Sequence, residues 1–401
     1  MDIEQIRKDF PMFKNNSNLI YFDNAATTFK PSCVLDKIQE YYTHFGVSVH
    51  RGTYNLSVAA EHMFEDTRAE VARFINSETS EIIFTANASY ALNSVALMIK
   101  DTLNSGDHIL SSPLEHHSAL LPYQNMEQEK GCVLDYINLL PDGRVDMSNF
   151  NKLITNNVKV VIVSLVSNTM GYYLDVKQIC SIAHKKGAIV IVDMTQGISY
   201  YNVDVKKMDC DFAVFSAHKL LGPTGVGVMY GKHKYLEKMS PVFYGGEMIQ
   251  SVSYHFSKLA PIPYKYEVGT PNIAGVIAFG EAIRYINSIG KDAIHEREQE
   301  LKNYLIQELS KIQGITIYNM TCDTPIVNFN IDGVPSHDAS TFYDSYNVAI
   351  RAGQHCAALV TNFLGVNATL RASLYFYNTK EEIDKFIIAS KKIVKFFSEN
   401  K

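Results

Sequence analysis

Short apolar runs alternate with longer amphipathic segments through the middle of the chain. The runs are rich in Val, Ile and Phe, and several are almost continuously apolar, which is typical of strands buried on both faces of a parallel sheet. Helical stretches lie between them, such as 175–186, which ends at Gly187. This alternation predicts an α/β fold with a large, doubly wound, mostly parallel sheet. The expected strands are 81–85, 108–111, 158–166, 188–193 and 211–216.

The C-terminal third follows a different pattern. Long charged, amphipathic stretches at 281–311 and 380–397 predict helices, and short apolar runs between them predict strands. These strands are expected at 325–331, 348–351 and 369–373. Helices and short strands in this order indicate a separate, smaller α+β domain.

The boundary between the two parts is marked by Pro261, Pro263, Gly269 and Pro271, because Pro and Gly cluster in connecting segments. We expect three units along the chain. They are an N-terminal segment that packs with the small domain, a large cofactor-binding domain, and the small C-terminal domain, at 1–20, 21–260 and 261–401.

Composition narrows the class of protein. The 401 residues carry a net charge of −5 and are 46% hydrophobic, which excludes a disordered chain and argues against a nucleic-acid-binding surface. No run of 18 apolar residues is present and the first residues lack a signal-peptide pattern, so we expect neither a membrane partner nor export. The six cysteines are scattered without metal-ligand spacing, which predicts no metal site and favours the cytoplasm.

Candidate chemistry gathers where the expected strands end, the edge at which open α/β sheets bind ligands. Asp193 ends one strand, and another runs into Ser216, His218 and Lys219. Taken singly, each of these residues is more often a turn former or a surface charge. Together they match pyridoxal phosphate, which needs a lysine for an imine, an acid for its ring nitrogen and donors for its phosphate.

The sequence resembles the class V aminotransferase family, and within it the group II cysteine desulfurases of the SUF type. The resemblance runs from about Tyr21 to Asn378 and rests on nine motifs in the order of the family. They are YFDNAAT at 21–27, HRG at 50–52, EHH at 115–117, VSN at 166–168, VDMTQ at 192–196, SAHK at 216–219, GTP at 269–271, RAGQHCA at 351–357 and RAS at 371–373.

This resemblance implies the transferase fold type I of pyridoxal-phosphate enzymes and a role for each matching residue. Lys219 would hold the cofactor and move a proton, Asp193 would pair with the ring nitrogen, and His116 would stack on the ring. The other cofactor contacts implied are Ala88, Ser89, Asn168, Gln196, Ser216, His218, and Thr270 from the second subunit of a homodimer. Substrate contacts are implied for Ala25, Asn168, Arg351 and Arg371.

Cys356 stands where the family carries its sulfur-accepting nucleophile. A lone cysteine is by default an inert buried thiol. However, Arg351 and His355 are basic neighbours, and nearby positive charge lowers a thiol pKa from about 8.5. Cys356 lies 15 positions before Arg371, and this short loop resembles group II.

The resemblance implies conversion of L-cysteine to L-alanine, with the sulfur taken onto Cys356 as a persulfide. It further implies a sulfur-acceptor protein, and iron–sulfur cluster assembly or related sulfur trafficking. His337 resembles a position that zinc-containing acceptor proteins engage in some relatives, although a solvated turn histidine is the simpler interpretation.

Some positions depart from the family pattern, and alternatives stay open. The segment 85–90 stands where relatives have a Gly-Thr-Thr phosphate loop, with Asn87 and Tyr90 unusual there. The alternatives are a selenocysteine lyase or cysteine-sulfinate desulfinase, a divergent pyridoxal-phosphate lyase, and a non-catalytic binding protein. An NAD enzyme is disfavoured because no GxGxxG motif follows an early strand.

Overall fold

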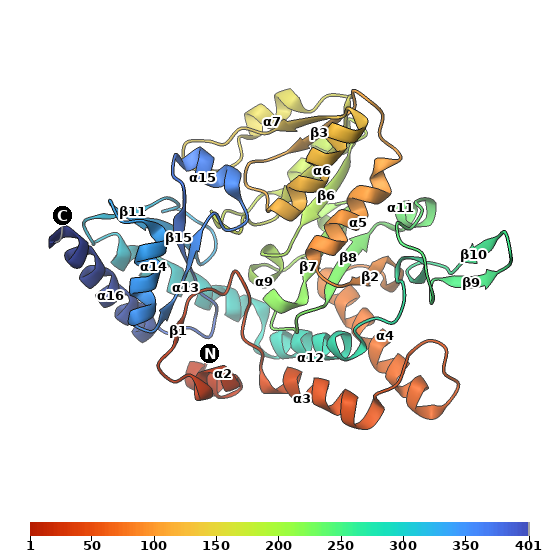
Figure 1. The fold of residues 1–401 in the computed structure, drawn as a ribbon, viewed down its shortest axis with the longest axis horizontal. Coiled ribbons are helices and arrows are strands. Elements are labelled where there is room, and N and C mark those ends of the chain that lie inside the picture. The colour runs from red at the N-terminus through yellow and green to blue at the C-terminus, as the bar shows by residue number, and fades with distance from the viewer. Residues whose placement is uncertain (400–401) are drawn as a thin grey trace.

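Seven strands form the central sheet of the structure, a computed structural model that describes residues 1–399 (Figure 1). The strands are β2 (Ile82–Thr85), β3 (His108–Ser111), β4 (Val133–Tyr136), β5 (Val158–Ser164), β6 (Ile189–Asp193), β7 (Phe212–Ser216) and β8 (Gly227–Gly231). Their order is β2-β8-β7-β6-β5-β3-β4, and only β8 runs antiparallel to its neighbours. The predicted α/β fold with a mostly parallel sheet is confirmed, whereas β4 and β8 were not among the expected strands.

Helices cover both faces of this sheet. Residues of α4 (Asn55–Ile75), α8 (Val176–His184) and α12 (Ile273–Ile289) form the core on one face, and those of α5 (Ala88–Lys100) and α6 (His117–Lys130) form it on the other. Alternate residues of β5 enter the two cores: Val161 and Val163 the first, Val160 and Ile162 the second. Burial on both faces is the physical reason that this strand is continuously apolar.

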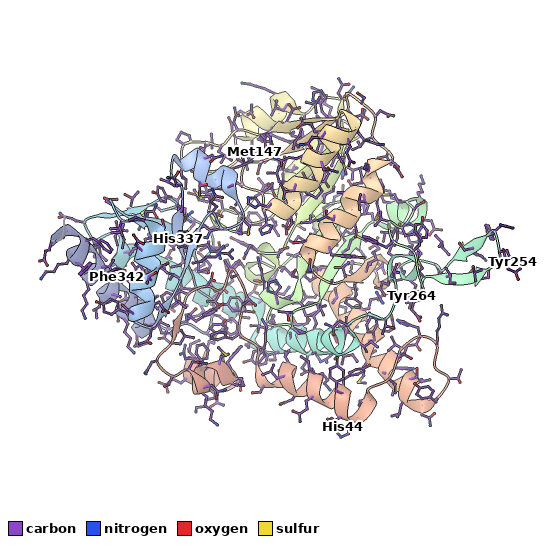
Figure 2. All side chains as sticks on the ribbon, viewed as in Figure 1. His44, Met147, Tyr254, Tyr264, His337 and Phe342 are labelled. Carbon is purple, nitrogen blue, oxygen red and sulfur yellow. The ribbon has the colours of Figure 1, made fainter. Side chains whose placement is uncertain are left out.

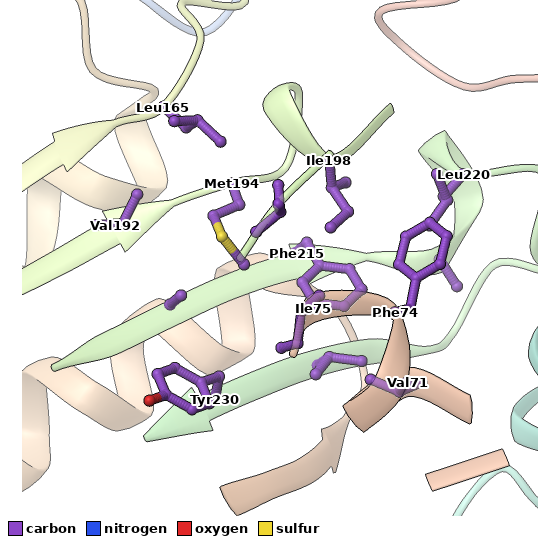
Figure 3. Close-up of a cluster of buried hydrophobic side chains, with 14 of the residues drawn as sticks. Val71, Phe74, Ile75, Leu165, Val192, Met194, Ile198, Phe215, Leu220 and Tyr230 are labelled. Atoms are coloured by element: carbon purple, nitrogen blue, oxygen red, sulfur yellow. The ribbon is translucent and has the colours of Figure 1, made fainter. Parts of the chain in front are cut away.

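Figure 3 shows the core on the α4 side, where Phe215 lies beside Phe74 and Ile75, and Val192 of the adjacent strand belongs to the same cluster. Val192 directly precedes Asp193, and Phe215 directly precedes Ser216. Both apolar residues are completely buried. The packing therefore fixes the strand ends at which the polar residues emerge.

A second, four-stranded antiparallel sheet lies in the C-terminal part, with the order β11-β12-β15-β14. Its elements are β11 (Ile315–Ile317), β12 (Ile326–Ile331), β14 (Arg351–Gly353), β15 (Thr369–Ser373), α13 (Lys291–Leu309), α14 (Ser336–Ser345), α15 (Ala358–Leu364) and α16 (Lys380–Glu399). The region expected as one helix at 281–311 is two, because Gly290 lies between α12 and α13 with a φ of 92°.

The N-terminal segment contacts both parts of the chain. It comprises α1 (Ile3–Lys8), α2 (Pro11–Asn15) and β1 (Ile20–Tyr21), and β1 pairs in parallel with β13 (Val348–Ala349). Phe10 packs edge-on against Tyr285 of α12 and against Tyr377. Helix α12 in turn packs on α3 (Ser32–Glu40) and α4. The division of the chain at 260/261 stays a prediction, and α12 lies with the helices of the larger part.

The remaining elements are short. They are α7 (Met147–Leu153), α9 (Gly197–Tyr200), α10 (Val205–Met208), α11 (His233–Lys238), the hairpin β9 (Ile249–Val252) and β10 (Ser257–Leu259), and helical turns at Tyr41–Phe45, Thr79–Glu81, Ala217–Lys219 and Tyr264–Tyr266. The hairpin projects from the body with a fully exposed Tyr254 at its tip (Figure 2). Across residues 1–399, none of the helices has the length and apolar character that a membrane crossing needs.

Candidate active site

A cavity of about 450 Å³ opens at the carboxyl ends of the central strands. It brings together twelve of the residues expected from the sequence, although they come from distant parts of the chain. These are Ala25, Ala88, Ser89, His116, Asn168, Asp193, Gln196, Ser216, His218, Lys219, Arg351 and Arg371. Which atoms of a ligand each one contacts stays a prediction.

Asp193 and Lys219 provide the acid and the amine of this cavity. The carboxylate of Asp193, at the end of β6, accepts a hydrogen bond from the backbone N–H of Thr195 at 2.9 Å. Lys219 lies in the helical turn that follows β7. Burial, aided by the nearby positive charge of Arg371, lowers the pKa of Lys219 to about 8, while Asp193 acts in the opposite direction. The amine is thus closer to its nucleophilic, neutral form than an ordinary lysine.

His116 begins the helix α6 and lines the same cavity. It is the N-cap residue, and its ring Nδ1 accepts a hydrogen bond from the backbone N–H of Ser118 at 3.1 Å. Burial lowers its pKa to about 4, although the charge of Asp193 opposes the shift. The ring is therefore neutral at physiological pH.

The N-terminus of α5 forms one wall of the cavity and is the expected anion site. Ala88 is the first helical residue, and its N–H donates to Ser216 Oγ at 2.8 Å. The Ser89 and Ser118 hydroxyls are 2.6 Å apart. First-turn N–H groups lack helical partners and favour phosphate. Burial lowers the pKa of His218, nearby in the cavity lining, to about 4.

The unusual residues of this wall have structural roles. The side chain of Asn87 caps α5 by accepting from Tyr90 N at 2.8 Å. The ring of Tyr90 stacks on Phe243 at a centroid distance of 5.2 Å. The Asn87 cap occupies the N–H of Tyr90, and Ser216 occupies that of Ala88, so this departure from the family pattern takes up one first-turn donor of the expected anion site.

Arg371 lies at another side of the cavity and is almost completely buried. Its Nη1 donates to the carbonyl oxygen of Asn168 at 2.9 Å, and its Nη2 lies 3.0 Å from the carboxylate of Asp23. The side-chain amide of Asn168 donates to the carbonyl of His355 at 2.7 Å. A planar guanidinium held in this way suits the recognition of a substrate carboxylate.

Buried polar atoms without protein partners test whether the cavity fits a ligand. Within the described residues, four such atoms belong to residues that line it: Asn168 Oδ1, Thr195 Oγ1, His355 Nδ1 and Arg371 Nε. Unpartnered buried polar groups are uncommon in proteins and call for a partner of another kind. With an acid, an amine and an anion site around one space, the residues present fit pyridoxal phosphate and an amino acid.

Two expected site residues are not part of the cavity lining. Cys356 is half-buried beside it, with its Sγ 3.7 Å from Nη2 of Arg351. Thr270 is exposed, and its neighbours Gly269 and Pro271 line a different cavity of about 260 Å³. Its expected role, to reach the phosphate of a second subunit, stays a prediction.

Sequence reasoning assigned no role to several residues that shape the site. Asp23 holds Arg371, Thr195 and Ser118 line the cavity, and Glu115 is buried with its carboxylate bonded to Ser112 and Ser164. Burial raises the pKa of Glu115 to about 7. Most of these residues stand inside or beside the recognised motifs, so position within a motif was the available signal.

Comparison with known proteins places the fold and the site in a family. A protein of Halalkalibacterium halodurans described as a probable cysteine desulfurase is 42% identical over 402 residues, covering 99% of both chains. The apo structure of a cysteine desulfurase from Thermococcus onnurineus NA1 matches with a TM-score of 0.94 and 38% identity over 98% of both chains. The cysteine desulfurase CsdA of Escherichia coli matches with a TM-score of 0.93 and 32% identity over 99% of both. The aminotransferase class-V model matches residues 20–386, and the chain belongs to this family.

Proposed function

We propose that the protein is a cysteine desulfurase that uses pyridoxal phosphate to convert L-cysteine to L-alanine and takes the sulfur onto Cys356. The observation that carries the proposal is the single cavity that unites Lys219, Asp193 and Arg371, with the Cys356 thiol next to it. The names of the full-length relatives support the same activity.

The cofactor has a residue for each of its parts. Lys219 would hold it covalently, Asp193 would pair with the ring nitrogen, and His116 would cover the ring. Ser216, His218 and the N-terminus of α5 would hold the phosphate. When bound, pyridoxal phosphate supplies an electron sink that stabilises negative charge at the α-carbon of an amino acid.

The chain's own groups carry the remaining steps. Arg371 and Asn168 orient the carboxylate of L-cysteine, and Nζ of Lys219 takes the α-proton. The Cys356 thiolate attacks the sulfur of the substrate, so that an S–S bond forms and the Cβ–S bond breaks. The electron pair of the broken bond stays on Cβ, which takes up a proton. Nζ of Lys219 then returns a proton to the α-carbon, and alanine leaves.

The sulfur on Cys356 passes to an acceptor protein, in iron–sulfur cluster assembly or related sulfur trafficking. The short Cys356 loop limits its travel, so the acceptor comes to the enzyme. His337 is exposed on α14 near Gly353 of β14, the strand that leads to Cys356 (Figure 2). Its part in acceptor binding stays a prediction, and a solvated surface histidine is the simpler interpretation.

The working form is a cytoplasmic homodimer in this proposal. Thr270 is exposed and is not among the residues that line the cavity, which leaves its side chain available to a second subunit. The projecting hairpin exposes Val252, Tyr254 and Phe256, which a second copy can bury. The six cysteines are all free, which suits a reducing compartment.

Alanine formation from L-cysteine by the cofactor-loaded protein, with a reductant present, tests the proposal. Wild type is compared with Cys356→Ala, and with Cys33→Ala as a control at another partly exposed thiol. We expect alanine from wild type and the control but not from Cys356→Ala. Equal alanine from all three would reject sulfur transfer through Cys356 and favour a selenocysteine lyase or cysteine-sulfinate desulfinase, which the same variants then test on those substrates.

A further inference from the structure

The loop that carries Cys356 has an unfavourable backbone conformation. His355 and Cys356 are consecutive non-glycine residues with φ of 53° and 57°. The left-handed region is costly for residues with a Cβ, and such residues persist only where surrounding contacts impose the conformation. The position of the thiol therefore depends on what holds the loop.

Two hydrogen-bond donors from outside the loop bind the carbonyl groups of its two strained residues. The side-chain amide of Asn168 donates to the carbonyl of His355 at 2.7 Å. The backbone N–H of His117 donates to the carbonyl of Cys356, also at 2.7 Å. Figure 1 shows this loop, between β14 and α15, beside the first turn of α6. His117 is thus bonded directly to the residue that receives sulfur.

The ring of His117 makes a second bond two residues after Cys356. Its Nε2 accepts a hydrogen bond from the backbone N–H of Ala358 at 3.1 Å. Ala358 is the first residue of α15, and no side chain of its own N-cap residue satisfies this end. The imidazole therefore serves as the missing cap, and the helix begins where the ring places it.

We propose that His117 is a positioning residue for sulfur transfer, which holds the Cys356 loop in its strained conformation by bonding the carbonyl of the cysteine and the backbone N–H of Ala358. The inference rests on the proposed function in that Cys356 receives the sulfur. His117 directly follows His116, so the start of α6 ties the residue over the cofactor to the loop of the nucleophile. One short segment then sets the distance between the two reacting centres.

The test compares His117→Phe, which removes the ring acceptor at similar size, with His117→Gln, whose side-chain oxygen reaches the same donor. Both variants keep the backbone N–H. We expect kcat for alanine formation to fall about fivefold in His117→Phe, the usual value of one neutral hydrogen bond, and to recover in His117→Gln. KM for L-cysteine should change less than about twofold, because His117 is not among the residues that line the cavity.

Two further readouts separate positioning from general damage. Exchange of the α-proton of L-alanine in heavy water needs Lys219 and the cofactor but not Cys356, and it should be unchanged in both variants. In the cofactor-free protein, the amide of Ala358 should exchange faster in His117→Phe, and the alkylation rate of Cys356 should change, both followed by peptide mass spectrometry. These last measurements do not depend on desulfurase activity.

The outcomes are distinct. A slower desulfuration with normal α-proton exchange, rescued by glutamine, supports the positioning role. Equal losses in both reactions, or an unchanged Ala358 amide and unchanged kcat in His117→Phe, overturn it. If wild type makes no alanine from L-cysteine, the proposed function fails, whereas amide exchange and Cys356 alkylation still decide whether His117 holds the loop.

Discussion

The guanidinium of Arg371 is held by the carboxylate of Asp23 at 3.0 Å, and the two residues come from opposite ends of the chain. Arg371 is 1% exposed, so its charge depends on this partner for compensation. The pair orients the guanidinium that is to bind the carboxylate of the substrate. One carboxylate oxygen of Asp23 can be replaced, as in Asp23→Asn, with little change in the shape of the side chain.

Asp23→Ala should weaken substrate binding. Without its partner, the guanidinium is free to turn, and a hydrogen bond to a charged group contributes about 1.5–3 kcal/mol. We expect KM for L-cysteine to rise roughly tenfold or more, with kcat changed much less. Asp23→Asn keeps a neutral acceptor in the same place and should give an intermediate KM in steady-state kinetics. An unchanged KM in Asp23→Ala would show that Asn168 alone positions Arg371.

The lowered pKa of Lys219 predicts the pH dependence of cofactor capture. Only the neutral amine attacks pyridoxal phosphate, and a pKa of about 8 means that the neutral fraction rises with pH and saturates above that value. The neutral fraction of an ordinary lysine would continue to rise up to a pH of about 10. The rate at which the cofactor-free protein binds pyridoxal phosphate covalently, followed by absorbance, should level off above a pH of about 9. Lys219→Ala gives the background from surface lysines, and a rate that keeps rising tenfold per pH unit would contradict the prediction.

Ser216→Ala should lower cofactor affinity without unfolding the protein. The hydroxyl accepts from Ala88 N at 2.8 Å and lies at the anion site, so its loss removes one link between β7 and α5. We expect the Kd of pyridoxal phosphate, measured by fluorescence titration, to rise about tenfold. Ser111→Ala is the matched control, because this buried hydroxyl at the end of β3 has no partner and its removal should leave Kd unchanged.

The buried carboxyl group of Glu298 leads us to expect that the free energy of unfolding falls as the pH rises. The residue is completely buried in α13, and neither carboxylate oxygen has a hydrogen-bond partner among residues 1–399. Burial raises its pKa well above the ordinary value of 4.5, so the folded state keeps a proton that the unfolded chain loses. This contribution is fully present below pH 4.5 and is lost as the pH rises.

Glu298→Gln removes the titration at constant shape. Relative to wild type, the variant should gain up to about 1.4 kcal/mol in the free energy of unfolding for each pH unit between roughly 5 and 7. Urea unfolding at several pH values measures this difference. A constant difference between the two proteins across this range would contradict a buried, protonated carboxyl group.

Local sequence patterns were sufficient to predict those elements whose pattern lies within one strand or one motif. Strands β5, β6 and β7 are predictable because burial on both faces makes them continuously apolar. Strand β8 is less visible because it begins and ends with glycine. A Cβ at Gly227 would come within 2.5 Å of the backbone of Asn87, so the close approach of α5 requires that glycine. Helix α12 is apolar around most of its surface, which removes the amphipathic period that would have marked its beginning.

For the site, too, local sequence predicts some residues and misses others. Asp193, Ser216 and Lys219 follow directly from their positions at strand ends, where the topology of the sheet brings them together. The roles of Asp23 and His117 depend on contacts with residues hundreds of positions away in the sequence, which no local pattern contains.

The segment 21–28 joins the two sides of the active site. Near its beginning, Phe22 and Ala25 are bonded to the backbone and side chain of Ser373, two residues after Arg371. At its end, Thr28 donates to the carbonyl of His218, next to Lys219. This stretch of chain sets the distance between Arg371, which is proposed to bind the carboxylate, and Lys219, which is proposed to move the proton. A single inserted or deleted residue in it would therefore shift both reactive ends against each other, so its length is under tighter constraint than its side chains.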